Sequence, residues 1–414
     1  MSITSIQKIF MEQKKIDINF IKKNLNLQAW INFLSGFTFL LPVITLLYTY
    51  VGLSIPQIIL IANVWSIVVF LFDLPTSIFA DIVGRKKALF IAVLCNLLAA
   101  MTIVFFPHYW WFIVASFFGW LYFAFWNSTG QAFLEENLRY IGEEKTFGKA
   151  IGHLMSLETI AGVVVALAVS WIIKRLWQEH WYRVLAILDT IFAFIIVVIT
   201  IKLKEIHPIQ AKLLGIKKIL LTSYTTTKNT IRNILMNKNM RVFMIYRSLA
   251  NHVAFLAIIS LPLRVKAWMD PWLAGILWII STMAIFIANK YAYKLWERWT
   301  YNRVWVFSTI AQAVLLIVVA FLLKSWIAIT VIMVLFNFAE GLWMPAWNHV
   351  LMWQTKWIAV ATTRSIIFTV FALYTTIGKQ ILARFPVEYA LIGLGVFIIL
   401  VNIVLWRKIL KLKQ

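Results

Sequence analysis

This sequence has little of what a water-soluble protein needs at its surface. Only 13% of its 414 residues are charged, and the 16 Asp and Glu residues are far fewer than the 39 Lys and Arg residues. Hydrophobic residues make up 62% of the chain, which leaves too little polar surface to cover a soluble domain. The single cysteine, Cys95, excludes a disulfide within the chain. The composition therefore excludes an ordinary soluble globular protein.

Long apolar runs are what the sequence has in abundance. Twelve stretches of roughly 20 residues are each long enough to cross about 30 Å of hydrocarbon as a helix. Backbone amides in lipid must be satisfied within the chain, and runs of this length achieve that as helices, whereas a barrel strand needs only about 10 residues. We expect an all-α polytopic membrane protein with spans at residues 27–49, 56–80, 87–106, 110–134, 148–173, 182–203, 241–263, 271–293, 303–323, 326–349, 357–379 and 387–406.

The spacing of these spans predicts two six-helix bundles joined by a polar segment. In that segment, apolar residues recur at helical spacing among lysines, which predicts a basic amphipathic helix lying on the membrane surface. A plain linker is the alternative interpretation. The predicted order is a cytosolic N-terminal segment (1–26), the first bundle (27–203), a cytosolic linker (204–240), the second bundle (241–406) and a cytosolic tail (407–414).

Basic residues predict the orientation of the chain. Most of the 39 Lys and Arg residues fall on the side of the membrane that holds both termini, and this bias marks the cytosolic side. The net charge of +23 follows from the same bias and is spread over many short loops, so it does not indicate nucleic-acid binding. We expect a monomer in contact with membrane lipids, in a plasma membrane or a bacterial inner membrane.

The loop between the second and third spans holds the most specific local pattern. Asp81 stands at a helix end, where a lone carboxylate is costly, so it should pair with a basic group or with the N-terminus of a neighbouring helix. Gly84 permits a tight turn, and Arg85 and Lys86 keep the loop on the cytosolic side. Such a charged cluster can hold two helices in one conformation.

Residues 72–87 resemble the cytosolic loop signature of the major facilitator superfamily, usually written G-x-x-x-D-x-x-G-R-K. They are most similar to a bacterial-type branch that places an acidic residue, a spacer and Pro-Thr before the signature. Ser77 stands where the family has its first Gly, and Asp73 replaces the more usual Glu. Residues 127–138 resemble the end of the fourth helix in the same branch, with Glu136 near its usual Asp.

The resemblance implies a conformational latch. In the superfamily this loop is taken to stabilise the outward-facing state through ties between the two halves, and the same is implied for Asp81, Gly84 and Arg85. Asp73, Lys86 and Glu136 are assigned to the same latch.

Polar residues at mid-membrane depth define a candidate cavity for substrate or protons. A carboxylate at that depth costs roughly 2.5 to 3.5 kcal/mol on insertion scales, so Glu158 and Glu340 are expected to face a wet cavity as proton or cation sites. Burial for packing alone is the alternative for both. The remaining candidates are Asn127, Ser128, Arg247, Asn251 and His252.

The resemblance favours Glu340 over Glu158, because helices 1, 4, 7 and 10 line the cavity in the superfamily. Arg247 could neutralise Glu340 when the cavity closes. If Glu340 does not carry the coupled proton, then Glu158, Asp189 or an uncoupled uniport mechanism is the next hypothesis.

The sequence contains no ATP-binding loop, no metal-binding spacing and no dinucleotide fingerprint, so we expect no enzyme activity, no cofactor and no metal site. We expect a secondary active transporter that moves a small solute by alternating access, coupled to protons or another cation. Two other classes stay open. A membrane-embedded transferase would need converging acids and histidines at one membrane face, and a non-transporting receptor or scaffold needs no special residues.

Overall fold

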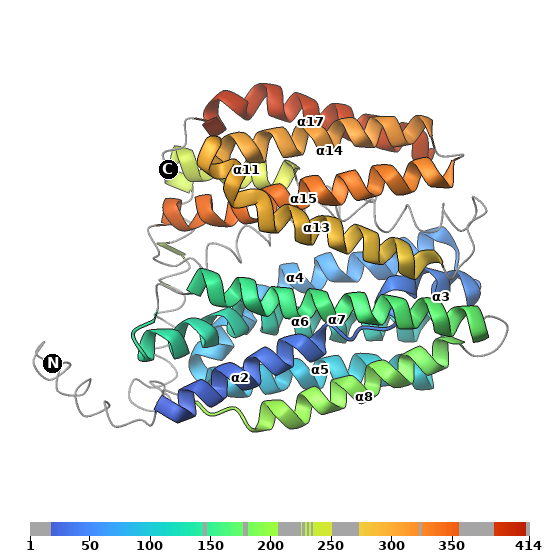
Figure 1. The fold of residues 1–414 in the computed structure, drawn as a ribbon, viewed down its shortest axis with the longest axis vertical. Coiled ribbons are helices and arrows are strands. Elements are labelled where there is room, and N and C mark those ends of the chain that lie inside the picture. Colours follow the sequence, from blue (N-terminus) through green and yellow to red (C-terminus); the bar gives the residue numbers. More distant parts are fainter. Residues whose placement is uncertain are drawn as a thin grey trace, which may run out of the picture.

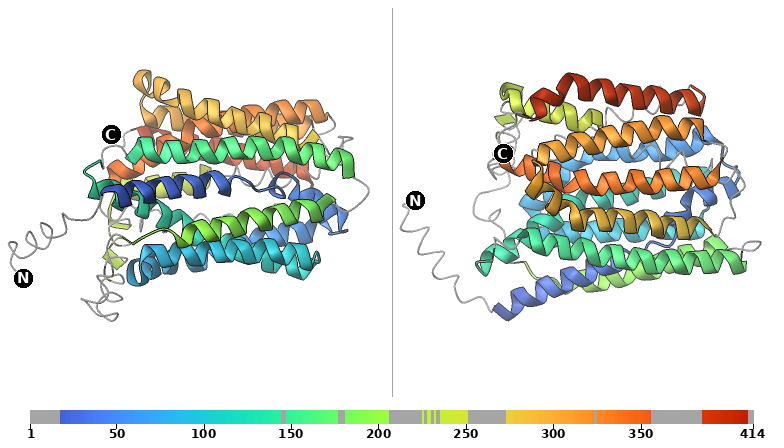
Figure 2. Two further views of the ribbon diagram at one scale, coloured as in Figure 1. Left: turned by 60° about the horizontal axis from the view of Figure 1, so that its bottom comes forward. Right: turned by 45° about the horizontal axis from the view of Figure 1, so that its top comes forward.

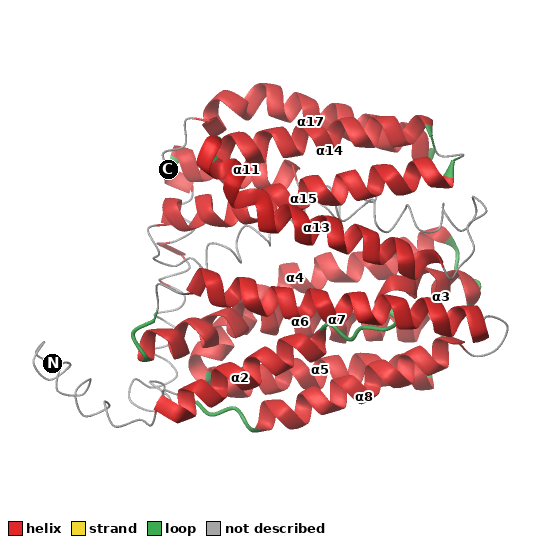
Figure 3. Cartoon of the chain, in the orientation of Figure 1, coloured by secondary structure: helices red, strands yellow, loops and turns green. Residues whose placement is uncertain are grey.

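The structure, a computed structural model, describes residues 18–143, 147–176, 181–205, 225, 228–229, 232, 235–250, 273–322, 325–355 and 385–410. The regular secondary structure in these ranges is helical (Figure 3). Three predicted features lie wholly or largely outside them: the second part of the span at 241–263, the span at 357–379 and the amphipathic helix of the linker. The described part of the chain agrees with the all-α prediction.

Most helices begin and end within a few residues of the predicted spans. The N-terminal half contains α2 (Ile18–Ser35), η2 (Leu41–Val43), α3 (Ile44–Tyr50), α4 (Ile55–Val83), α5 (Arg85–Phe105), α6 (Tyr109–Tyr140), α7 (Phe147–Leu176) and α8 (Trp181–Ile201). The C-terminal half contains α11 (Lys238–Ala250), α13 (Leu273–Arg298), α14 (Tyr301–Phe321), α15 (Trp326–Thr355) and α17 (Val387–Leu410). The helices α6 and α15 each run more than one turn past the predicted end, so they continue beyond the apolar core.

Six of the described helices are long and apolar enough to cross a membrane. These segments are Arg85–Phe105, Tyr109–Tyr140, Ser156–Arg175, Trp181–Ile201, Asn302–Phe321 and Glu388–Leu410. The start of α2 and the end of α17 lie on the same side of the molecule (Figure 1), as an even number of spans requires. The chain therefore has the architecture of a multi-pass membrane protein.

The helices form two groups that lie side by side (Figures 1 and 2). In the N-terminal group α6 packs on α4 and α5, α5 packs on α8, and α2 packs on α7 and α8. In the C-terminal group α15 packs on α13 and α14, and α17 packs on α11 and α14. The two groups meet where α13 contacts α7 and the short helix η2.

Each half has its own apolar core. In the N-terminal half, Phe112, Trp181 and Leu185 are almost completely buried in one cluster. In the C-terminal half, Leu316 of α14 and Phe336 of α15 pack with the buried residues of α17. Each group therefore has internal packing of its own.

The first span differs from its prediction. A single helix was expected over residues 27–49, but α2 begins at Ile18, ends at Ser35 and is followed by five non-helical residues before η2. Pro42 lies in the first turn of η2, where its missing N–H costs nothing but where it cannot continue a helix from upstream. The Asp189 carboxylate accepts hydrogen bonds from the backbone N–H groups of Phe39 and Leu40. This carboxylate satisfies donors that the break would otherwise leave without acceptors in the membrane.

Candidate functional site

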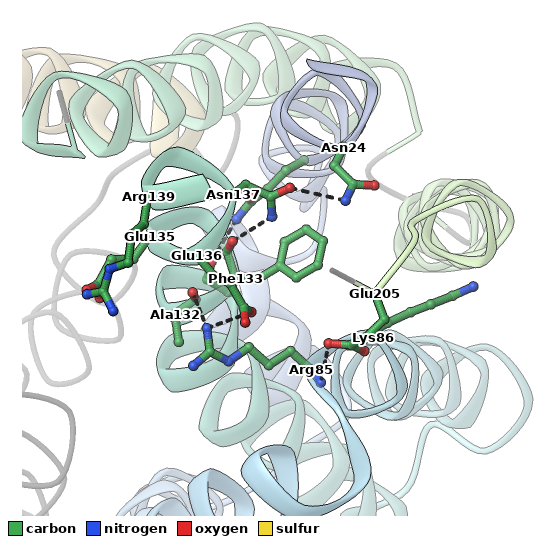
Figure 4. Close-up of polar contacts among 12 residues, drawn as sticks. Asn24, Arg85, Lys86, Ala132, Phe133, Glu135, Glu136, Asn137, Arg139 and Glu205 are labelled. Atoms are coloured by element: carbon green, nitrogen blue, oxygen red, sulfur yellow. Dashed lines mark hydrogen bonds and ion pairs between the residues drawn. The ribbon is translucent and has the colours of Figure 1, made fainter. Parts of the chain in front are cut away.

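The predicted latch forms a polar cluster where α4, α6 and α8 end and α5 begins (Figure 4). Gly84 separates α4 from α5 with a φ of +104°, a conformation that L side chains rarely adopt. Its N–H bonds to the carbonyl of Ala80 and closes α4, and Arg85 begins α5 immediately afterwards. The glycine in the motif is therefore explained by the sharp change of direction between the two helices.

Arg85 and Glu136, both predicted, form an ion pair. Nη1 of Arg85 lies 2.9 Å from Oε2 of Glu136 and donates a second hydrogen bond to the carbonyl of Ala132 at 2.5 Å. The two charged side chains are 27% and 19% exposed, so water screens the pair only in part. This contact joins the start of α5 to the C-terminal part of α6.

Glu205 is a member of the cluster that the sequence analysis missed. Its carboxylate accepts the backbone N–H of Arg85 at 3.1 Å and that of Lys86 at 2.8 Å. Both N–H groups belong to the first turn of α5, which has no partners for them within the helix, and the negative charge complements the positive end of the helix dipole. Glu205 thus supplies, from just after α8, the cap that α5 lacks in its own sequence.

Burial is the main cause that raises the pKa of the Glu205 carboxyl above its ordinary value, and the two backbone donors oppose this rise. Repulsion from Glu136 raises the pKa further, whereas attraction to Arg85 lowers it. The Arg85 guanidinium therefore pairs with Glu136 and also attracts the nearby Glu205 carboxylate. The only signal in the sequence was an isolated carboxylate among lysines after the sixth span.

Amide side chains extend the cluster to the first helix. Asn24 of α2 donates to Oδ1 of Asn137 at 3.1 Å and to the carbonyl of Lys204 at 2.9 Å, and its own Oδ1 accepts the Lys204 N–H. These contacts and those of Arg85 all join elements of the N-terminal half. The ties between halves that the resemblance implies stay a prediction.

The other predicted latch residues have simpler placements. Asp73 is buried on α4, where its carbonyl accepts the hydroxyl of Thr76. Asp81 lies in the last turn of α4, and its side chain is outside the described part of the structure. Lys86 contributes its backbone N–H to the cluster.

Gly84 gives a test of this geometry. A Cβ atom at Gly84 would lie 3.0 Å from Oε2 of Glu205, whereas Gly52 has a φ of +84° and nothing within 4 Å of an added Cβ. We expect Gly84→Ala to lower the free energy of unfolding by about 1–3 kcal/mol, because the backbone is strained and the new Cβ crowds the Glu205 carboxylate. Gly52→Ala should lose less, because it shares the positive φ but not the contact. Thermal unfolding of the purified variants measures both, and equal losses at the two sites would contradict the proposed contact.

In the C-terminal half, Arg247 of α11 and Glu340 of α15 lie near each other. Arg247 of α11 is only 5% exposed, and its guanidinium lies 4.7 Å from the ring centre of Trp343. The same guanidinium is close enough to the Glu340 carboxylate of α15 to interact with it electrostatically. Trp343 was not predicted as a site residue, although its position one turn after Glu340 places both on one face of α15.

The neighbouring Tyr246 fixes α11 within the bundle. Its hydroxyl lies 2.7 Å from the hydroxyl of Thr309 on α14 and donates to Oδ1 of Asn402 on α17 at 2.6 Å. Its ring packs edge-on against the buried Trp305. Arg247 is therefore held beside α15 by a helix that is itself anchored to two others.

Glu340 lies on the interior face of α15. Four exposed apolar side chains recur every three or four residues along this helix and mark its lipid face: Ile327, Val331, Leu335 and Phe338. Glu340 follows Phe338 by two residues, which places it about 200° around the helix from that face. The carboxylate therefore points into the protein, as the cavity prediction requires.

The remaining predicted cavity residues are distributed over both halves. Glu158 lies on α7 and Asn127 on α6, both in the N-terminal half, so neither joins the Arg247 cluster. The side chain of Ser128 and the whole of Asn251 and His252 lie outside the described residues. No group of three or more His, Cys, Asp or Glu residues that could hold a metal occurs in the described part of the chain.

Comparisons with known proteins agree with the helical membrane fold. Residues 25–378 match the family profile described as "Major Facilitator Superfamily". Among curated proteins, none matches this sequence significantly.

Solved structures with the same fold include proton-coupled and nucleoside transporters. A crystal structure of the D-xylose-proton symporter has a TM-score of 0.72 at 12% identity and covers 94% of this chain and 98% of its own. Crystal structures of the nucleoside transporter NupG and of a mutant form of NupG have TM-scores of 0.69 and 0.70 at 13% and 12% identity, and each covers 95% of this chain and 100% of its own. At such low identity these likenesses show the fold, and the profile match shows the family. The chain belongs to the major facilitator superfamily.

Proposed function

We propose that this member of the superfamily is a proton-coupled secondary transporter that moves a small solute by alternating access between its two halves. Family membership makes the chain a transporter and not an enzyme. The observation that supports proton coupling is the buried Arg247, which lies over the face of Trp343 and interacts electrostatically with the Glu340 carboxylate.

The chemistry of this cluster links proton binding to helix packing. A buried guanidinium without a counter-charge is costly, so the ionised Glu340 stabilises Arg247 at its present place. A proton on Glu340 removes that counter-charge and leaves Arg247 with the aromatic face of Trp343. A cation–π contact stabilises a buried guanidinium less than an ionised carboxylate does. Protonation therefore changes the free energy of holding α11 against α15. A solute that binds only one arrangement of these helices is thereby coupled to the proton.

The contact between the two halves is suited to this mechanism. The helix α13 belongs to the same bundle as α15 and packs on it, and it also contacts α7 and η2 of the other half. A change at Glu340 can reach the opposite half through this helix. In the same proposal the protein is a monomer in the cell membrane with both termini in the cytosol, and Asp81, Arg85 and Glu136 bias the populations of its states.

Proton movement in proteoliposomes tests the function. The purified protein is reconstituted with a pH-sensitive dye inside the vesicles, and candidate solutes are added outside without an imposed gradient. A coupled transporter should change the internal pH when its solute is added, and empty vesicles should not. A radiolabelled solute that enters the vesicles with no proton movement and no response to an imposed pH gradient would show that the transporter is not proton-coupled.

A further inference from the structure

The break in the first span leaves two helix ends facing each other near the middle of the membrane. The predicted span at 27–49 is centred within the five non-helical residues that follow Ser35. The carbonyl groups at the C-terminus of α2 carry partial negative charge, although those of Asn32, Phe33 and Leu34 accept hydrogen bonds from the residues that follow them. The N-terminus of η2 carries partial positive charge on its N–H groups. Discontinuous helices at this depth are where secondary transporters of other folds bind ions and charged substrate groups.

A carboxylate already satisfies the positive end. The oxygens of Asp189 accept the N–H groups of Phe39 and Leu40 at 2.5 and 3.1 Å. Asp189 comes from α8, and aromatic rings close this side of the break, where Phe37 stacks on Phe192 with ring centres 4.4 Å apart. Asp189 therefore has a structural role at the break, and it is not free to serve as a second ion site.

The negative end of the break lies against Glu158. A Cβ atom at Gly36, the first residue after α2, would collide with the backbone carbonyl of Glu158, so the end of α2 packs directly on this turn of α7. The partial negative charge at the C-terminus of α2 has the same sign as the Glu158 carboxylate and does not stabilise it. This place in the structure favours a positively charged group.

The Glu158 side chain points into the protein and is accessible there. Exposed apolar residues mark the lipid face of α7 at Ile160, Val164, Leu167 and Trp171. Glu158 precedes Ile160 by two residues and so lies about 200° around the helix from that face. Gly162, one turn further along the same interior face, has nothing within 4 Å of an added Cβ. The exposed carboxylate therefore borders open space inside the protein.

Hydroxyl and aromatic groups lie beside this carboxylate. Tyr122 of α6 is close enough to Glu158 for electrostatic interaction, and its hydroxyl lies near the side chain of Ser35 at the end of α2. The ring of Trp126, one turn along α6, has its centre 5.9 Å from that of Tyr122. Among the described residues, the ion pairs join Arg85 to Glu136 and Arg139 to Glu135, and Glu158 has no basic partner.

We infer that Glu158 recognises the positive charge of the transported solute, and that the solute is an organic cation of the alkylammonium class. The carboxylate supplies the counter-charge, and the negative C-terminal end of α2 also attracts a cation. The aromatic side chains of α6 favour an alkylated ammonium over a small hydrated metal ion. The inference rests on the proposed transport function but not on its proton coupling, which was assigned to Glu340 in the other half.

Binding to the purified full-length protein tests this inference without any gradient. The probes are tetramethylammonium, tetraethylammonium and phenyltrimethylammonium, and tert-butylbenzene serves as the uncharged isostere of the last. At least one ammonium probe should raise the thermal midpoint and bind in an equilibrium assay, whereas the isostere should not. Glu158→Gln keeps the shape of the side chain and should weaken probe binding at least tenfold. Glu388→Gln removes an exposed carboxylate at the start of α17 and should leave binding unchanged.

A second variant separates loss of binding from loss of folding. Gly162→Leu places a side chain in the open space beside Glu158 without altering any charge, and it should also weaken probe binding while the unliganded thermal midpoint stays near that of the unmodified protein. Unchanged binding in Glu158→Gln would overturn the inference, as would a protein that none of the three ammonium probes stabilises more than the isostere. Because binding is measured at a single pH, failure of proton coupling through Glu340 leaves this result unaffected.

Discussion

Glu340→Gln should abolish accumulation of the transported solute under a pH gradient while leaving counterflow exchange intact. The amide has nearly the same shape as the carboxyl group but cannot take up or release a proton. A gradient of one pH unit supplies about 1.4 kcal/mol per proton, which allows about tenfold accumulation at one proton per solute. The variant should therefore bring the internal concentration only to the external value. Uptake of a labelled solute into proteoliposomes, with and without a gradient, measures this ratio.

Two controls make this result specific. Glu388→Gln, which removes an exposed carboxylate in the first turn of α17, should accumulate solute as well as the unmodified protein. Arg247→Gln in the Glu340→Gln background should restore part of any lost thermal stability, because it removes the buried guanidinium that the first substitution leaves without its counter-charge. Full accumulation in Glu340→Gln would exclude this residue from coupling and would transfer the hypothesis to another carboxylate, first Glu158.

The ion pair between Arg85 of α5 and Glu136 of α6 should contribute more to stability than the exposed pair between Arg139 and Glu135 within α6. A double-mutant cycle with Arg85→Ala and Glu136→Ala should give a coupling energy of about 1–2 kcal/mol, since the pair is partly buried and charge-assisted. Arg139 and Glu135 lie 2.6 Å apart on the surface of α6, with side chains 66% and 49% exposed. Their cycle should give about 0.3–0.5 kcal/mol.

Thermal or denaturant unfolding of the purified variants provides the four stabilities that each cycle needs. High salt should weaken the exposed pair more than the partly buried pair, because exposed charges are screened more completely. Equal coupling energies in the two cycles would show that the contact at Arg85 anchors the loop no better than an ordinary surface pair does. The proposed role of the cluster as a latch would then lack its energetic basis.

The N-terminal cluster shows how far a local motif can be interpreted. Gly84, Arg85 and Glu136 were identified from their order in the sequence, and the structure brings Arg85 and Glu136 into contact. Glu205 was not identified, because it lies 120 residues from Arg85 and matches no motif position. Its role as a cap depends on α8 ending beside the start of α5. Such a long-range helix cap cannot be predicted from the residues on either side of it.

The carboxylates within the membrane also show what the sequence predicts and what depends on tertiary contacts. Their depth in the spans predicted that Glu158 and Glu340 are not simple lipid-facing residues, and the exposed apolar residues of α7 and α15 place both on interior faces. The sequence did not show that Glu158 and Glu340 have different neighbours. Glu340 has Arg247 and Trp343 beside it, whereas Glu158 lies at the carbonyl end of a broken helix. Asp189 was considered a coupling residue, but it holds the other end of that break.

The sequence by itself determined that this chain is a helical membrane protein, because runs of about 20 apolar residues have no other stable arrangement in lipid. It also determined the family, since the profile of the superfamily matches the sequence over residues 25–378. Only the tertiary structure decided that the first span is broken at Gly36, because the break depends on a carboxylate that α8 brings to the N–H groups of Phe39 and Leu40. Hydrophobicity along the chain reports which segments enter the membrane, whereas helix breaks, caps and charge partners depend on contacts between segments far apart in the chain.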